Sequence, residues 1–135
     1  DRYKSYSYRI ETSDHVIGFT GDTGRSKSVT KLLDGVDILI TETSSCDERK
    51  NRMIGDGTWQ KMTDDEKEGI MRQATQGHMG LENIGKLATE AKVKTVVLSH
   101  LTRRYQSQDY GPWAEEVKKY FNGEVIVAED LMEFT

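Results

Sequence analysis

This sequence has very little cysteine and no long run of apolar residues. A single cysteine, Cys46, occurs among 135 residues, which excludes an intramolecular disulfide and any zinc knuckle built from several cysteines. We interpret Cys46 as a structural or incidental thiol. No stretch approaches the roughly 18 consecutive apolar residues of a transmembrane helix, so no membrane span is expected.

A block of like charge is also missing. The chain has 19 Lys and Arg residues against 23 Asp and Glu residues, a net charge of −4. The basic footprint of a nucleic-acid-binding domain is therefore absent from the chain as a whole. This absence argues only weakly against a nucleic-acid substrate, because a bound metal ion would supply positive charge where the substrate lies.

The residues that are present fit one globular domain. The length suits a single ordinary core, and the apolar (35%) and charged (31%) fractions are nearly equal, as in soluble globular proteins. No repeat or linker divides the chain, so residues 1–135 are expected to form one domain.

The spacing of apolar residues predicts alternating strands and helices. Alternation in Tyr6–Ile10 predicts a half-buried strand, and short β-branched runs predict strands at 16–19, 37–41, 95–99 and 124–128. Helical spacing and capping signals predict helices at about 26–35, 63–75, 81–91 and 112–121. The polar stretch 43–63 has no clean period and is interpreted as a long loop, in which Trp59 either covers a cleft or pins the loop to the core. Strand, helix and strand in succession indicate parallel pairing and an α/β layer structure.

Two polar residues occupy matching positions at strand ends. Asp22 follows the strand 16–19 on a turn flanked by glycines, and His100 follows the strand 95–99. Ligands of open α/β sheets collect at the carboxyl ends of strands, and Asp and neutral His both bind zinc-like metals. The alternatives are a turn-forming or helix-capping Asp22 and a His100 that is merely hydrogen-bonded.

His78 and Glu42 are the next candidates. His78 lies in a Gly-His-Met-Gly break between two predicted helices, where it either protonates a leaving group or is simply an exposed joint residue. Glu42 ends the strand that begins at Asp37 and points to the same sheet edge, so it would orient His78 as a supporting carboxylate. His15 lies beside a turn at the opposite end of its strand and is left out.

Two other interpretations of the turn at Asp22 are rejected. Asp-Thr-Gly is the active-site triplet of aspartic proteases, but that fold is almost wholly β, and here the triplet precedes a helix. A phosphate-binding loop at Gly21–Ser26 would use the helix N-terminus, but the lysine-bearing spacing of a P-loop is absent.

The order of these motifs resembles the second half of a metallo-β-lactamase superfamily hydrolase, in particular the ribonuclease Z-like branch. The matching segments cover essentially the whole chain: Tyr8–Glu11, Val16–Gly24, Asp37–Thr43, Gly77–Met79, Val96–Leu101 and Glu124–Asp130. The resemblance implies a mixed sheet with helices packed on it, which is half of a four-layer αββα sandwich.

The resemblance also implies a role for each candidate. Asp22 corresponds to the aspartate that bridges two zinc ions, and His100 to the last histidine ligand. His78 and Glu42 correspond to a pair that assists proton transfer at the leaving group. A metal-activated water would then attack an ester, a lactone or a phosphodiester.

The loops around His78 and Glu42 depart from the branch. Met79-Gly80 stands where the branch has Ser-Thr, and Thr41–Ser44 stands where it has His-Glu-Ala-Thr. Transfer RNA end processing is therefore doubtful, and a small-molecule ester, lactone or phosphodiester substrate remains open.

The first-half signature of the family, His-x-His-x-Asp-His, is absent, since the three histidines are at 15, 78 and 100. Asp22 and His100 alone do not complete a zinc site, which needs three or four ligands. We therefore expect a C-terminal half that is inactive in isolation and pairs with the missing N-terminal half or with a second copy. The rival is a non-catalytic α/β binding or assembly module, for which Asp22 and His100 would lie far apart or in a packed interior.

Overall fold

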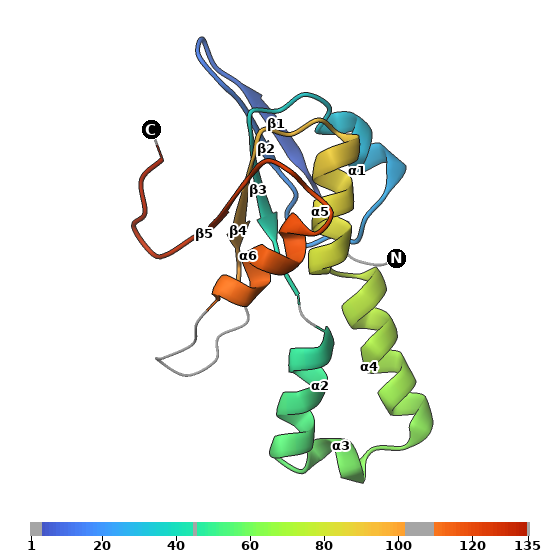
Figure 1. Cartoon of the computed structure of the whole chain (residues 1–135). Coiled ribbons are helices and arrows are strands. Elements are labelled where there is room, and N and C mark those ends of the chain that lie inside the picture. Colours follow the sequence, from blue (N-terminus) through green and yellow to red (C-terminus); the bar gives the residue numbers. More distant parts are fainter. Residues whose placement is uncertain (1–3, 45, 102–109, 135) are drawn as a thin grey trace.

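A five-stranded mixed sheet forms the centre of the computed structural model, which describes residues 4–44, 46–101 and 110–134 (Figure 1). The strands lie in chain order across the sheet: β1 (Tyr8–Glu11), β2 (Val16–Phe19), β3 (Ile38–Glu42), β4 (Thr95–Ser99) and β5 (Glu124–Val127). β1 is antiparallel to β2, and the remaining pairs are parallel. The predicted α/β class and the mixed sheet are confirmed.

Helices connect the parallel strands. They are α1 (Lys27–Leu32), α2 (Cys46–Gly55), α3 (Thr58–Lys61), α4 (Asp64–Gln76), α5 (Leu81–Glu90) and α6 (Gly111–Lys118). Of these, α1, α5 and α6 cover one face of the sheet. Apolar side chains of α1, α5 and α6 form one buried core with Leu39 of β3 and with Val96 and Leu98 of β4. No described helix is long and apolar enough to cross a membrane.

The other face of the sheet exposes apolar side chains at its β1–β2 edge. Tyr8 and Ile10 pair with Phe19 and Ile17 across the two strands, and Tyr8, Ile10 and Phe19 are 56%, 52% and 39% exposed. Gly18, between Ile17 and Phe19, faces the helices instead: a Cβ added there would lie 2.4 Å from a side-chain carbon of Leu33, the residue after α1. The prediction of a half-buried first strand is therefore wrong, because the described helices pack on the other face.

The first helix is shorter than its apolar spacing predicts. α1 ends at Leu32, and Gly35 follows with a φ of +70° and donates its N–H to the carbonyl of Ala91. Val36 is fully buried although it lies beyond the helix. Val36 continues the helical spacing of apolar residues because it packs into the core after the chain has left the helix, and not because the helix extends to it.

The prediction of a loop at 43–63 is also wrong. α2 and α3 occupy most of it and, with α4, extend beyond the carboxyl ends of the strands (Figure 1). Residues 49–55 of α2 are half-buried or exposed, so the helix lacks the apolar stripe by which a buried helix is recognised. Trp59 lies under the ammonium groups of Lys50 and Lys67, 5.5 and 5.9 Å from its ring centroid, which places it within this extension.

The close packing of α5 against α6 depends on a glycine, and this gives a stability test. A Cβ at Gly85 would lie 2.7 Å from the carbonyl oxygen of Val117, whereas a Cβ at Gly69 of α4 would meet nothing within 4 Å. Gly85→Ala is expected to destabilise the fold by about 1–3 kcal/mol through overpacking. Gly69→Ala is the matched control and should stabilise it by about 0.5–1 kcal/mol. Urea unfolding measures both, and a neutral Gly85→Ala would contradict the close approach of these two helices.

Candidate functional site

Asp22 is presented by a strained turn after β2. Gly21 has a φ of +61°, and a Cβ there would lie 2.6 Å from the carbonyl oxygen of Tyr6. The Ser5 hydroxyl donates a hydrogen bond to the backbone carbonyl of Asp22. Glycine is therefore required at position 21 by both conformation and space, and the Asp22 carboxylate is left 59% exposed at the sheet edge.

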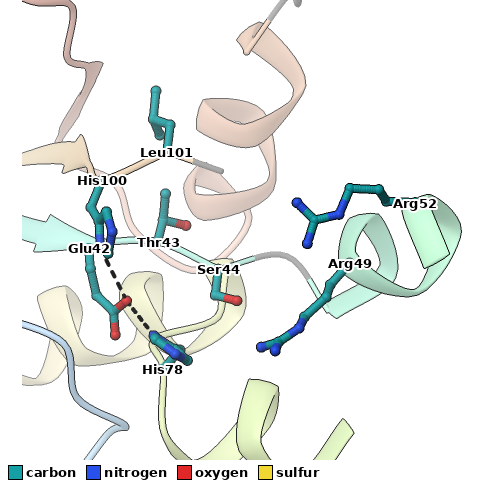
Figure 2. A pocket seen from close by; sticks show the side chains of 8 residues that line it. All are labelled: Glu42, Thr43, Ser44, Arg49, Arg52, His78, His100 and Leu101. Carbon is teal, nitrogen blue, oxygen red and sulfur yellow. Dashed lines mark hydrogen bonds and ion pairs between the residues drawn. The ribbon is translucent and has the colours of Figure 1, made fainter. Parts of the chain in front are cut away.

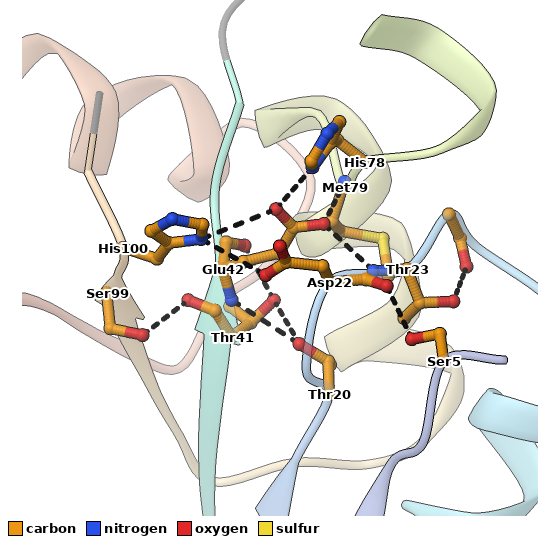
Figure 3. A network of polar contacts seen from close by, with 11 residues as sticks. Ser5, Thr20, Asp22, Thr23, Thr41, Glu42, His78, Met79, Ser99 and His100 are labelled. Carbon is orange, nitrogen blue, oxygen red and sulfur yellow. Dashed lines mark hydrogen bonds and ion pairs between the residues drawn. The ribbon is translucent and has the colours of Figure 1, made fainter. Parts of the chain in front are cut away.

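Glu42, at the end of β3, is the buried centre of the site. Its side chain is only 3% exposed. One carboxylate oxygen, Oε1, accepts hydrogen bonds from the backbone N–H groups of Thr23 (2.9 Å) and Met79 (3.2 Å). The other oxygen, Oε2, lies 2.7 Å from Nδ1 of His78. These contacts offset the cost of burying the carboxylate, and they join three separate segments of the chain (Figure 3).

His78 lies in the short connection between α4 and α5. The backbone of this connection is held against the segment after β3, because the Ser44 N–H donates to the carbonyl of Met79 at 3.0 Å. With Nδ1 on Glu42, the Nε2 atom of His78 has no partner among the described residues. His78 also lines a cavity, so its second ring nitrogen is available to a bound molecule.

His100 follows β4 and meets Asp22. Its Nδ1 atom lies 3.1 Å from Oδ1 of Asp22 and 3.9 Å from Oε2 of Glu42. The residue has a φ of +50°, a conformation that costs free energy in a residue with a side chain and that is often retained at functional sites. Asp22 and His100 are thus together and solvent-exposed, as the hydrolase interpretation requires, and the rival expectation of distant or interior positions is not met.

Asp22, Glu42 and His100 form a cluster that suits a metal ion. Each offers one ligand atom, and these atoms lie within 4.8 Å of one another. Two carboxylates and an imidazole are a donor set that binds zinc and similar transition metals. Glu42 was expected at this sheet edge only as a partner of His78, so its place among the possible metal ligands is new. Its position at the end of β3, between β2 and β4, is the sequence signal that places it there.

Hydroxyl groups support the strand ends beneath this cluster. Thr20 and Thr41 are fully buried, and their Oγ1 atoms lie 3.3 Å apart. The Thr41 hydroxyl donates to the carbonyl of Glu42 at 2.8 Å, and the Ser99 hydroxyl donates to the carbonyl of Thr41 at 3.2 Å. Figure 3 shows these contacts below the Asp22–Glu42–His100 group.

A cavity of about 320 Å³ opens beside His78 (Figure 2). Its lining comes from β3 and the segment after it, from α2, and from the connections that follow α4 and β4. These residues are Glu42, Thr43, Ser44, Arg49, Arg52, His78, His100 and Leu101. Sequence reasoning missed Thr43, Ser44, Arg49 and Arg52, because it placed them in a loop without a pattern. The remaining histidine, His15, lies before β2, outside both the cavity lining and the cluster.

The comparisons with known proteins concern the family and the fold of the chain. The family model described as "Beta-lactamase superfamily domain" matches residues 1–101. A ribonuclease Z of Archaeoglobus fulgidus is 31% identical over 133 residues, which cover 92% of this chain and 36% of that protein. The chain spans about a third of the length of the curated relatives it matches.

Two solved structures share the fold. The metallo-β-lactamase fold protein YhfI from Bacillus subtilis has a TM-score of 0.63 and 23% identity, and the match covers 92% of this chain and 41% of that one. Human tRNase Z, short form, has a TM-score of 0.56 and 20% identity, with 96% and 37% covered. Because the family model covers well over half of the sequence, the chain belongs to the metallo-β-lactamase superfamily, within which it is similar to ribonuclease Z proteins.

Proposed function

We propose that the protein to which this chain contributes is a metal-dependent phosphodiesterase with its reacting centre at Asp22, Glu42, His78 and His100. The observation that carries the proposal is the 2.7 Å contact between Oε2 of Glu42 and Nδ1 of His78. Beside it lie the exposed side chains of Asp22 and His100, with Oδ1 and Nδ1 3.1 Å apart. The curated relatives bear the name ribonuclease Z, which favours a phosphodiester, RNA included. They give no support to the expected small-molecule ester or lactone.

Asp22 and His100 are proposed to hold the metal, with zinc as the first candidate. Both are more than half exposed on the side chain, so further ligands can approach them. Glu42 is the weaker ligand of the three, because N–H donors already occupy both of its oxygens. A bound ion would supply a Lewis acid and an activated water.

His78 is proposed to give a proton to the departing oxygen. Glu42 accepts from Nδ1 and so fixes the ring orientation, in the way that a carboxylate orients a catalytic histidine. The protonated ring then presents Nε2–H to the cavity. This chain has Met79-Gly80 where the ribonuclease Z-like branch has Ser-Thr. The difference does not affect the contact with Glu42, because Met79 donates its backbone N–H and not its side chain.

The remaining half of the αββα sandwich is proposed to cover the exposed sheet face of β1 and β2. Tyr8, Ile10 and Phe19 lie there at 56%, 52% and 39% exposure, and a contiguous apolar surface marks an interaction site. A second copy of this chain is the other candidate for that position. The non-catalytic alternative keeps this interface but needs neither a metal nor His78.

Metal content tests the ligand assignment. In the full-length gene product, Asp22→Asn and His100→Ala should each lower bound zinc substantially, because a site with one ligand fewer binds more weakly. Elemental analysis after gel filtration gives the readout, with His15→Ala as the histidine control that retains the metal. Wild-type metal content in both site variants would contradict the assignment.

Leaving-group dependence tests His78. His78→Ala and Glu42→Gln should lower kcat by about 10²–10⁴-fold on a phosphodiester with an alkoxide leaving group, which needs a proton. With bis(p-nitrophenyl) phosphate, whose p-nitrophenolate leaving group departs without a proton, the same substitutions should lower kcat much less. Equal losses on both substrates would show that His78 serves the fold or the metal rather than proton transfer.

The isolated chain is expected to lack activity. Asp22 and His100 are its two exposed ligands, and Glu42 is already hydrogen-bonded, so we infer that residues 1–135 alone do not hold the metal firmly. The purified segment should therefore hydrolyse neither substrate, and mixing it with the remainder of the gene product should restore turnover. Metal-dependent hydrolysis by the segment alone, above a chelator-treated blank, would overturn this expectation.

A further inference from the structure

The cavity beside His78 has a cationic side that the proposed hydrolytic centre does not use. Arg49 and Arg52 are three positions apart on α2, so they lie on the same side of the helix, and both line the cavity. Figure 2 shows their guanidinium groups extending from α2 toward the side where Ser44 and His78 lie. Among the described residues of this lining, Glu42 is the acidic one, and its oxygens are already hydrogen-bonded.

Neither arginine is neutralised by a contact ion pair among the side chains that the structure describes. Arg52 has one acidic neighbour on its own helix end, Asp56. The pKa of Asp56 is lowered chiefly by hydrogen bonds from Thr58, and to a smaller extent by the charge of Arg52. Two guanidinium groups that line one cavity, without a carboxylate partner among the described side chains, are suited to bind an anion.

The side chain of Thr43 is a second, independent indication that this cavity binds a ligand. The residue is 2% exposed, and its hydroxyl oxygen is buried without a hydrogen-bond partner among the described residues. It also lines the cavity. A buried hydroxyl that makes no hydrogen bond costs free energy, and a ligand oxygen at this position would remove that cost.

We propose that Arg49, Arg52 and Thr43 form a binding site for a phosphate group of the substrate other than the one that is cleaved. Guanidinium groups bind phosphate oxygens through paired N–H donors, and the Thr43 hydroxyl donates a further hydrogen bond. Asp22, His100 and His78 act on the scissile phosphate, and α2 holds its neighbour. The substrate would therefore carry a second phosphate next to the scissile one, a step that rests on the proposed function.

Phosphate binding by metal-free protein tests the site separately from hydrolysis. The full-length gene product is treated with a chelator and titrated with inorganic phosphate by calorimetry. Arg49→Gln and Arg52→Gln should each weaken the affinity about tenfold, the effect of losing one charge-assisted contact. Arg72→Gln on α4, which removes the same charge outside the cavity lining, should change it less than twofold. Equal effects of all three substitutions, or none, would overturn the site.

Thr43→Val keeps the side-chain shape and removes the hydroxyl. It should weaken phosphate binding severalfold and leave the melting temperature of the phosphate-free protein unchanged or higher, because the hydroxyl has no partner to lose. A lower melting temperature would show that the hydroxyl serves the fold, and would remove Thr43 from the site.

Kinetics with two substrates separate the neighbouring phosphate from the scissile one. Arg49→Gln should lower kcat/KM about tenfold for a short oligoribonucleotide. The kcat/KM for bis(p-nitrophenyl) phosphate, which has no second phosphate, should not change. Equal losses on both would place the arginines at the scissile group and contradict the proposal. Zinc content of the same variants should stay at the wild-type level, so a failure of the metal assignment and a failure of the phosphate site give different results.

Discussion

The buried carboxylate of Glu42 is the constraint on which the rest of the site depends. A carboxylate at 3% exposure is tolerated only where its oxygens accept hydrogen bonds. Its donors come from residues 19, 36 and 37 positions away, namely Thr23, His78 and Met79. The turn after β2 and the connection between α4 and α5 are therefore both held at the end of β3. The same requirement that stabilises the carboxylate also orients the His78 ring.

Around this buried centre the side chains of Asp22 and His100 are exposed, and the backbone of His100 is strained. Asp22 follows a glycine with a φ of +61°, and His100 has a φ of +50°. Both side chains lie at the carboxyl edge of the parallel strands, with the hydroxyl contacts of Thr20 and Thr41 beneath them. A strained His100 beside a buried carboxylate whose oxygens accept hydrogen bonds is the arrangement expected where a chain gives up stability to position chemical groups.

Two features of the described residues support the proposal that this chain pairs with further protein. The sheet exposes Tyr8, Ile10 and Phe19 on the face away from the helices, and the two exposed residues proposed as metal ligands, Asp22 and His100, leave room for further ligands. The proposed pairing with the other half of the sandwich would account for both features. The match to about a third of the length of the curated relatives agrees with this view.

Local pattern was sufficient to predict the strands and the proximity of the four candidate residues. The β-branched runs at 16–19 and 95–99 could be located by composition, and parallel strands necessarily bring their ends, and so Asp22, Glu42 and His100, to one edge. The contacts of Glu42 with Thr23 and Met79, by contrast, depend on how distant segments fold back, which no local spacing records. The arginines of α2 were missed because a solvent-facing helix leaves no apolar stripe. The exposure of β1 was missed because alternation shows which side chains share a face, whereas only the packed structure determines what covers that face.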